Sequence, residues 1–183
     1  MALFLALNSI IFYEPEKNGG IMKSRAIVLG ETNDCLLEFC KYLMSKDLEV
    51  YLALKKNQEF ITLRDIENPI TIIRLNDDFE EIKFLLNSIE PNVIYNLYDL
   101  EHKIELKELL EKSYVNVILI LEALRTSHNT KLINLIEKTQ RDEKGNPLTL
   151  QTAVLDSLNK VTKFYNDFYN IQTLIKFKDE YKI

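Results

Sequence analysis

The chain has 183 residues, of which 46% are hydrophobic and 28% are charged, and its formal net charge is −5 at pH 7. These values are typical of an ordinary soluble globular protein that is long enough for one well-buried domain and short for two. The negative net charge argues against nucleic acid or an anionic membrane surface as the main partner.

We interpret the first 21 residues as an extension that precedes the domain. Met1–Tyr13 is apolar, and a polar, glycine-bearing stretch follows it. The apolar run is too short to span a bilayer, and it lacks the basic start and small-residue cleavage site of a secretory signal. A membrane-surface or partner-docking segment is one interpretation. We favour a plain appendage, or an upstream start codon with the domain beginning at Met22.

A β-α-β unit is predicted next. It consists of a buried strand (Ala26–Leu29), a turn opening at Gly30, a helix over about Asp34–Ser45 and a second strand (Leu48–Leu54). Such a unit begins a nucleotide-binding sheet, in which a glycine-rich turn normally cradles a pyrophosphate. Here only the first glycine of the turn is present.

The cysteines and histidines predict no disulfide and no metal site. Cys35 and Cys40 lie on the first helix, about 140° apart around its axis at about 100° per residue, which suits neither a disulfide nor a shared metal. We therefore expect core thiols in a reducing compartment, and a cytoplasmic protein. His102 and His128 are isolated in the sequence, and no Cys/His cluster accompanies them.

Strands continue to alternate with helices along the rest of the chain. This pattern predicts a single α/β domain over residues 22–183, with a doubly wound parallel sheet in a Rossmann-like three-layer arrangement. Ligands on such sheets bind at the carboxyl ends of the strands, near the point where the strand order reverses. The further expected strands are Pro69–Leu75, Val93–Leu97, Lys131–Ile136 and Ile171–Phe177, and the further expected helices are Phe79–Ile89, Ile104–Arg125 and Thr149–Tyr169.

Two of these helices carry additional signals. Asp78, with Glu81 three residues later, resembles a capping box, and capping explains the paired aspartates Asp77 and Asp78 more simply than metal or acid–base chemistry. The segment Val115–Leu124 is apolar nearly all round, so we expect it to be buried against the sheet or in a helix–helix interface.

Four stretches, in their order and spacing, resemble the nucleotide-binding half of the extended short-chain dehydrogenase/reductases. They are the first β-α-β unit, the passage FEEIKFLLNSIEPNVIYNL, the sequence ILEALR at the end of the long helix, and Asn146-Pro147-Leu148-Thr149. Within that family the chain is most similar to the nucleotide-sugar epimerases and dehydratases, the GDP-mannose 4,6-dehydratase type in particular. The resemblance runs from Met22 to about Phe177 and stops where the family begins its sugar-binding domain, which implies that the C-terminal substrate domain is lacking.

The resemblance implies a dinucleotide site, but the turn departs from the family pattern. The three family glycines fall on Gly30, Asn33 and Leu36. Asn33 can tolerate a left-handed backbone, whereas Leu36 would either pack as core or occupy cofactor space. The acidic residue that the family places after its third strand falls on Leu75. The residues that the resemblance assigns to cofactor binding are Gly30, Thr32, Asn33, Lys55, Lys56 and Leu97.

The basic pair after the second strand bears on which dinucleotide could bind. Lys55 and Lys56 would suit a 2′-phosphate, and no acid sits at the strand end to hold a ribose diol. Any dinucleotide is therefore expected to be NADP rather than NAD. Two solvated lysines after a strand are the plain alternative.

The catalytic positions implied by the resemblance are not occupied by catalytic residues. The family uses a Tyr-x-x-x-Lys pair, in which the lysine lowers the tyrosine pKa so that the phenolate acts as a base. These two positions hold Gln151 and Leu155, and a shifted register that uses Lys160 puts Asp156 at the tyrosine position. The Thr or Ser expected after the fifth strand falls near Glu137–Lys138. No catalytic residue is predicted.

These departures predict a degenerate NAD(P)-binding-fold protein, non-catalytic, that acts as a scaffold or partner subunit and binds nucleotides weakly or not at all. Its expected interface is the helix around Val115–Leu124, in a homodimer or a larger protein complex, although the same pattern fits plain core. Two alternatives stay open: a sugar-nucleotide dehydratase or epimerase that uses NADP with an altered or partner-completed site, and a nucleotide-sensing regulatory module.

Overall fold

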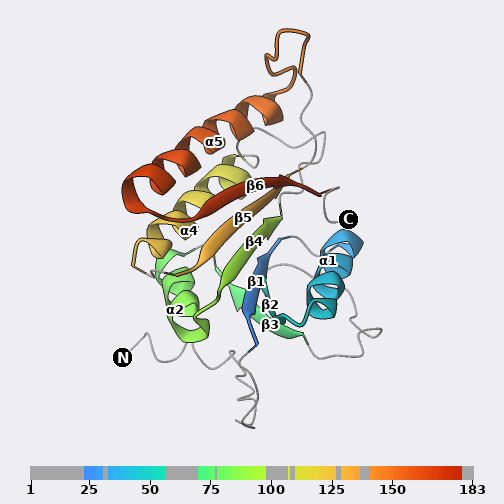
Figure 1. Ribbon diagram of the computed structural model, residues 1–183, viewed down its shortest axis with the longest axis vertical. Helices are drawn as coiled ribbons and strands as arrows, with labels where there is room; N and C mark the ends of the chain where they lie inside the picture. The colour runs from blue at the N-terminus through green and yellow to red at the C-terminus, as the bar shows by residue number, and fades with distance from the viewer. Residues whose placement is uncertain are drawn as a thin grey trace.

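Six parallel strands form one sheet in the computed structural model of the chain (Figure 1). The structure describes residues 23–30, 33–56, 70–76, 78–97, 107, 110–126, 129–136 and 141–178. The strand order is β3-β2-β1-β4-β5-β6, so the order reverses between β1 and β4. This arrangement confirms the predicted doubly wound α/β fold. The strands are β1 (Arg25–Leu29), β2 (Glu49–Lys55), β3 (Thr71–Leu75), β4 (Val93–Leu97), β5 (Lys131–Ile136) and β6 (Thr173–Phe177).

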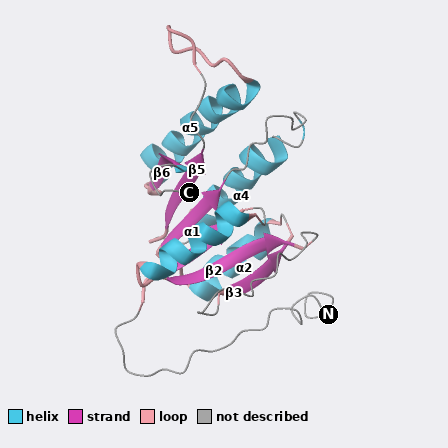
Figure 2. Cartoon of the chain, turned by 90° about the vertical axis from the view of Figure 1, so that its right-hand side faces the viewer, coloured by secondary structure: helices cyan, strands magenta, loops and turns pink. Residues whose placement is uncertain are grey.

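Helices cover both faces of this sheet. The helices α2, α4 and α5 lie on one face and α1 lies on the other, as Figures 1 and 2 show from two directions. A π-helical turn, η2, leads directly into α4, so the described part of the predicted long helix is not a uniform α-helix. The bounds are α1 (Asp34–Ser45), α2 (Phe79–Ile89), η2 (Leu110–Val115), α4 (Asn116–Leu124) and α5 (Leu150–Tyr169).

Side-chain caps set where the helices begin. At α2, the Asp78 carboxylate accepts a hydrogen bond of 2.7 Å from the Glu80 backbone N–H, which confirms the predicted cap. The second half of the expected capping box is wrong. Glu81 instead accepts hydrogen bonds from the backbone N–H of Asn76 at 2.6 Å and from its side-chain amide at 2.7 Å, because the chain leaving β3 passes within reach of that carboxylate.

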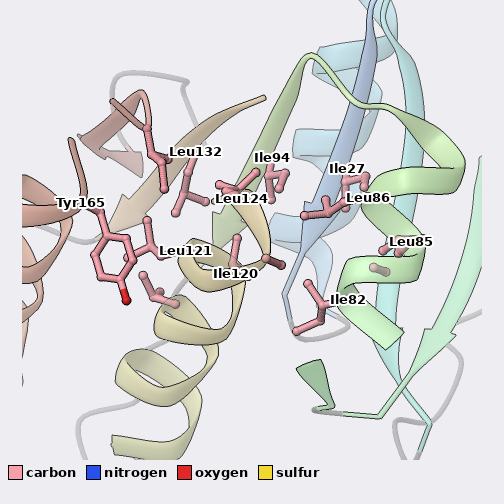
Figure 3. Packing of buried hydrophobic residues seen from close by; sticks show 14 of the residues in the cluster. Ile27, Ile82, Leu85, Leu86, Ile94, Ile120, Leu121, Leu124, Leu132 and Tyr165 are labelled. Carbon is pink, nitrogen blue, oxygen red and sulfur yellow. The ribbon is translucent and has the colours of Figure 1, made fainter. Parts of the chain in front are cut away.

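Two apolar clusters form the core, one on each face of the sheet. The larger lies under α2, α4 and α5, and Figure 3 shows strand residues Ile27, Ile94 and Leu132 meeting side chains of α2 and α4 there. The smaller lies under α1. Most of the Val115–Leu124 segment belongs to the larger cluster, so its apolar pattern is explained by burial on the sheet. The buried residues of α4 are Val117, Ile120, Leu121, Ala123 and Leu124.

Neither cysteine is in a disulfide, and the two differ in environment. Cys40 is buried, and this burial raises the pKa of its thiol to about 12. Cys35 is only half-buried, so the expectation of two core thiols is wrong for it, because it lies at the margin of the stripe that α1 buries through Leu36, Phe39, Cys40 and Leu43.

Some features of the sequence lie outside the described residues. They are the N-terminal segment 1–22, Thr32, Asp77, both histidines and Glu137–Lys138. Within the described ranges, no helix is long and apolar enough to cross a membrane. In the same ranges, no three His, Cys, Asp or Glu side chains gather to form a metal site.

Candidate functional site

The turn after β1 and the ends of β2, β3 and β4 share the carboxyl edge of the sheet. In the parallel register, Leu29 of β1 lies beside Ala53 of β2 and beside Asn96 of β4. Gly30 and Leu97 therefore lie next to each other at the point where the strand order reverses. The carboxyl edge at this point is where ligands bind in this architecture, and Gly30, Asn33 and Leu97 lie there, while Thr32 is outside the described residues.

Asn33 caps the first helix instead of adopting a left-handed turn. Its backbone is extended, with φ −148° and ψ 172°, so Asn33 does not use the left-handed conformation that asparagine tolerates. Its side-chain oxygen accepts a hydrogen bond of 2.8 Å from the Leu36 N–H. In a dinucleotide site, the N–H groups at this helix end point at the phosphates. Here the protein itself uses one of them, and Asp34 adds a carboxylate in the first turn, which disfavours an anion there.

The Leu36 side chain fills the space over Gly30. Leu36 is only 1% exposed and belongs to the smaller core cluster together with Phe39 and Leu97. A Cβ atom on Gly30 would lie 2.9 Å from Leu36 Cδ1 and 3.3 Å from Leu97 Cβ. Among the described glycines only Gly145 has a positive φ, so the backbone conformation does not require a glycine at position 30. Gly30 is explained by the close packing of a leucine side chain.

Of the basic pair at the end of β2, Lys56 is already engaged through its side chain. Lys56 Nζ lies 3.3 Å from Glu81 Oε1, in an ion pair in which both side chains are partly exposed. The backbone carbonyl of Lys55 accepts a hydrogen bond of 3.0 Å from Arg74. A 2′-phosphate would have to compete with the Glu81 carboxylate for Lys56. Leu75, at the position of the family's acidic residue, is buried in the larger core cluster.

No Tyr–Lys pair forms at the start of α5. Gln151 is half-buried, and Leu155 is buried in the larger core cluster. In the alternative register, Asp156 makes a two-point ion pair with Arg141, with N···O distances of 2.5 and 3.1 Å. The hydrogen bond from Arg141 lowers the pKa of the Asp156 carboxyl, which keeps it ionised, and Lys160 is exposed. These side chains hold the start of α5 in place and offer no acid–base pair.

A buried amide pair on neighbouring strands was missed in the sequence. Asn96 of β4 donates a hydrogen bond of 3.2 Å from Nδ2 to Asn134 Oδ1 of β5. Both lie two residues after core residues of the α2/α4/α5 face, Ile94 and Leu132, so they point to that face. Asn134 Nδ2 has no hydrogen-bond partner among the described residues. An asparagine inside each of two otherwise apolar strands was the signal that could have revealed the pair.

A second missed arrangement ties α5 to α4. The Tyr165 hydroxyl donates a hydrogen bond to the Glu122 carboxylate, which also pairs with Arg125 at 2.7 Å. The Arg125 guanidinium lies 4.4 Å from the centroid of the Tyr169 ring. Burial, and secondarily the bond to Glu122, raises the pKa of Tyr165 to about 12, while the hydrogen bond from Tyr165 lowers the pKa of Glu122. This side-chain network connects the two helices.

A polar pocket of about 450 Å³ lies beside this network, at the amino ends of β5 and β6. It is therefore at the opposite edge of the sheet from Gly30, and it takes no part in the nucleotide-type site. Its lining residues are Leu124, Arg125, Asn129, Thr130, Tyr169, Asn170, Ile171 and Gln172.

Comparison with known proteins gives a likeness in fold only. No protein-family model and no curated protein matches the sequence. The UDP-glucose 4-epimerase of Thermus thermophilus, in complex with NAD, superposes with a TM-score of 0.65 at 15% identity, covering 82% of this chain and 53% of that one. The dTDP-glucose 4,6-dehydratase of Bacillus anthracis str. Ames, in complex with NAD, gives a TM-score of 0.66 at 13% identity, covering 84% and 54%.

A third solved structure, the glucuronic acid dehydrogenase of Chromohalobacter salexigens, has a TM-score of 0.66 at 15% identity, covering 83% of this chain and 59% of that one. At such identities the likeness establishes the Rossmann-like α/β fold. The chain spans about half the length of these structures.

Proposed function

We propose that this chain is a non-catalytic relative of the nucleotide-sugar epimerases and dehydratases, which serves as a scaffold or partner subunit and binds dinucleotides weakly or not at all. The observation that carries the proposal is the position of Leu36, whose buried side chain lies against Gly30 where the turn would have to admit a pyrophosphate. The shared fold with enzymes solved in complex with NAD supports the relationship.

Three separate features weaken a dinucleotide site at this edge. The Asn33 cap uses an N–H group at the start of α1, Leu36 closes the approach to Gly30, and Glu81 neutralises Lys56. The first two act on the pyrophosphate and the third acts on a 2′-phosphate. Because they affect different parts of the cofactor, relief of one of them leaves the others in place.

The catalytic positions support the same conclusion independently of the cofactor. A Gln side chain cannot exchange a proton near neutral pH, and a buried Leu offers neither a charge nor a donor, so Gln151 and Leu155 cannot replace a Tyr–Lys pair. The kinship to the GDP-mannose 4,6-dehydratase type rests on the sequence passages described above, and the proposed cytoplasmic location rests on two cysteines that form no disulfide.

A second candidate function is catalytic. It is a sugar-nucleotide dehydratase or epimerase that uses NADP and whose site is completed by a partner chain. Lys55 and Lys56 at the end of β2 favour it, since basic residues there suit a 2′-phosphate. A nucleotide-sensing module would also bind a nucleotide, but without turnover.

Calorimetric titration of the full chain with NADH and NADPH tests these functions. We expect no saturable binding of either dinucleotide up to millimolar concentrations. Micromolar binding of NADPH would contradict the proposal; with no turnover of a GDP- or dTDP-sugar, it would instead support the sensing module. A matched pair of variants adds a control: Leu36→Ala opens the space over Gly30, whereas Leu43→Ala removes an equally buried leucine elsewhere on α1. Any gain in binding should occur only in Leu36→Ala.

A further inference from the structure

The polar pocket beside α4 and α5 has no role in the proposed function. Its volume of about 450 Å³ lies within the range of about 300–1,000 Å³ that is usual for small-molecule sites. It lies at the amino ends of β5 and β6, whereas the turn at Gly30 lies at the carboxyl edge of the sheet. A ligand here would therefore be independent of a dinucleotide, and the chemistry of the lining residues indicates its class.

The pocket combines buried residues with exposed polar ones. Leu124, Thr130 and Ile171 are buried, and the Thr130 hydroxyl is fixed by a hydrogen bond of 2.7 Å to the Pro91 carbonyl. An amide group both donates and accepts hydrogen bonds, as a hydroxyl group does, so amides at a pocket suit a ligand that carries several hydroxyls. The exposed lining residues include three that carry side-chain amides, namely Asn129, Asn170 and Gln172.

Two helix ends make the pocket unfavourable for an anion. The helices α4 and α5, which lie side by side in Figure 1, end at Leu124 and Tyr169, and both of these residues line the pocket. The C-terminal end of a helix carries a partial negative charge and C=O groups that lack partners within the helix. The described last turns of both helices contain no basic residue that would offset this charge. The pocket is therefore rich in acceptors and suits a ligand that supplies hydrogen-bond donors.

Arg125 makes the pocket unfavourable for a cation as well. Among the described residues that line the pocket, Arg125 alone is charged. Its guanidinium is paired with the Glu122 carboxylate at 2.7 Å and lies 4.4 Å from the centroid of the Tyr169 ring. It thus occupies the place where a cationic ligand would meet the ring, and a second cation there would be repelled. Since the pair of Arg125 and Glu122 has no net charge, an anion gains little from the guanidinium.

We propose that this pocket binds a neutral, hydroxyl-rich small molecule, that is, a saccharide or a polyol. Hydroxyl groups of the ligand donate to the acceptors at the two helix ends, and they also accept hydrogen bonds from the amide N–H groups of Asn129 and Gln172. A ligand without charge avoids both the negative helix ends and the guanidinium of Arg125. The inference goes beyond the proposed function and stands whether or not the chain binds a dinucleotide, because the two sites lie at opposite edges of the sheet.

Titration of the isotope-labelled full chain, followed by NMR, tests the ligand class with D-glucose, D-glucosamine, D-glucose 6-phosphate and sorbitol. In slightly acidic buffer the first three share one ring and are neutral, cationic and anionic. We expect D-glucose to bind saturably, with a dissociation constant of about 1–10 mM and with shifts of side-chain amide signals. Both charged analogues should bind at least about fivefold more weakly. Sorbitol distinguishes the two sources, because its binding supports an open-chain polyol and its failure to bind beside D-glucose supports a ring saccharide.

Variants of exposed amide residues locate the binding without a change in the core. Asn129→Ala and Gln172→Ala should each raise the dissociation constant for D-glucose by about three- to tenfold, the usual effect of one lost hydrogen bond. Asn87→Ala is the matched control, since Asn87 is an exposed amide on α2, away from the pocket. This control should change the dissociation constant by less than about twofold.

Arg125→Gln tests the role of charge. It removes the cation that covers the Tyr169 ring and takes this partner from Glu122, so D-glucosamine should gain about tenfold in affinity relative to D-glucose. An unchanged order of the two probes in this variant would overturn the proposal. So would the lack of saturable binding of D-glucose and sorbitol up to about 100 mM, or rim variants no weaker than Asn87→Ala, or tighter binding of D-glucose 6-phosphate than of D-glucose.

Discussion

At the turn after β1, the strand–turn–helix backbone of the Rossmann-like fold is present and a side chain fills the space over its glycine, whereas at the start of α5 the positions at which the resemblance places a Tyr–Lys pair hold other side chains. The turn keeps Gly30 and the helix that begins beside it, with Leu36 seated over the glycine. At α5, the position of the expected Tyr holds Gln151, which is half-buried, and the position of the expected Lys holds Leu155, which lies in the core. Under the proposed function, the two regions depart from the family pattern by different physical routes.

This difference shows how each region would respond to repair. At the turn, removal of one side chain reopens space next to a backbone of the right shape. At α5, a restored lysine would have to enter an apolar cluster that now supports the fold. A departure that fills space beside a backbone is therefore easier to reverse than one that places an apolar residue in the core.

The substitution Leu155→Lys should have the largest effect, because it places an ammonium group in the larger core cluster without a partner. We expect a loss of about 4 kcal/mol in the free energy of unfolding, measured by urea denaturation. Leu155→Met, which conserves the volume, is the control and should lose less than about 1.5 kcal/mol. If the lysine variant were as stable as the methionine variant, the side chain at position 155 would not be buried in the larger core cluster.

The substitution Gly30→Ala tests the packing role of the glycine. Its new Cβ would meet Leu36 Cδ1 and Leu97 Cβ at short range, so we expect a loss of about 1–2 kcal/mol in the otherwise native chain. In a Leu36→Ala background the same change should have almost no effect, and a double-mutant cycle measures this coupling. Equal losses in the two backgrounds would mean that Gly30 is kept for another reason.

Tyr165→Phe removes the hydroxyl that binds Glu122 and should lower the free energy of unfolding by about 1.5 kcal/mol at neutral pH. The pKa of Tyr165 is raised to about 12 from an ordinary value of 10.0, so the neutral hydroxyl stabilises the fold below pH 10. That contribution is lost as pH rises from about 10 to about 12.

The Tyr165→Phe variant lacks this ionisation, so its stability should fall less over that alkaline range than that of the native chain. Some dependence remains in both proteins, because the pKa of Tyr51 is also raised to about 12, chiefly by burial. Parallel stability curves for the two proteins above pH 10 would show that Tyr165 is not buried against Glu122 in solution.

The substitution Asn33→Ala should have the smallest effect, a loss of about 1 kcal/mol, because it removes the side-chain cap of α1. Asn33→Asp keeps the capping oxygen and should be close to neutral in stability. Thermal unfolding followed by circular dichroism measures both. A destabilised Asp variant together with an unaffected Ala variant would refute the capping role.

Local patterns in the sequence were sufficient for the elements of the fold. The bounds of α1, α2, β4 and β5 agree with those expected from the sequence, because the two helices each have one apolar face and the two strands are short apolar runs buried on both faces of the sheet. The candidate site was harder to predict from the sequence. Leu36 left two outcomes open in the sequence, since only the packing of α1 on β1 and β4 decides between core and cofactor space.

Contacts between distant segments could not be predicted in this way. Glu81 follows Asp78 at the spacing of a capping box, yet it bonds to Asn76 and pairs with Lys56 across 25 positions of chain. The bond between Asn96 and Asn134 likewise depends on the register of two strands, which no single stretch encodes.

The close contact between Gly30 and Leu36 also predicts how these two positions vary together among homologous chains. A glycine at the end of a first strand is usually taken as the remnant of a phosphate-binding motif, but here the adjacent leucine imposes it. In homologous chains, the two positions should therefore covary: a large side chain at 36 should accompany glycine at 30, and a small one should permit alanine. A glycine at this position can thus be required by side-chain packing and not only by a ligand.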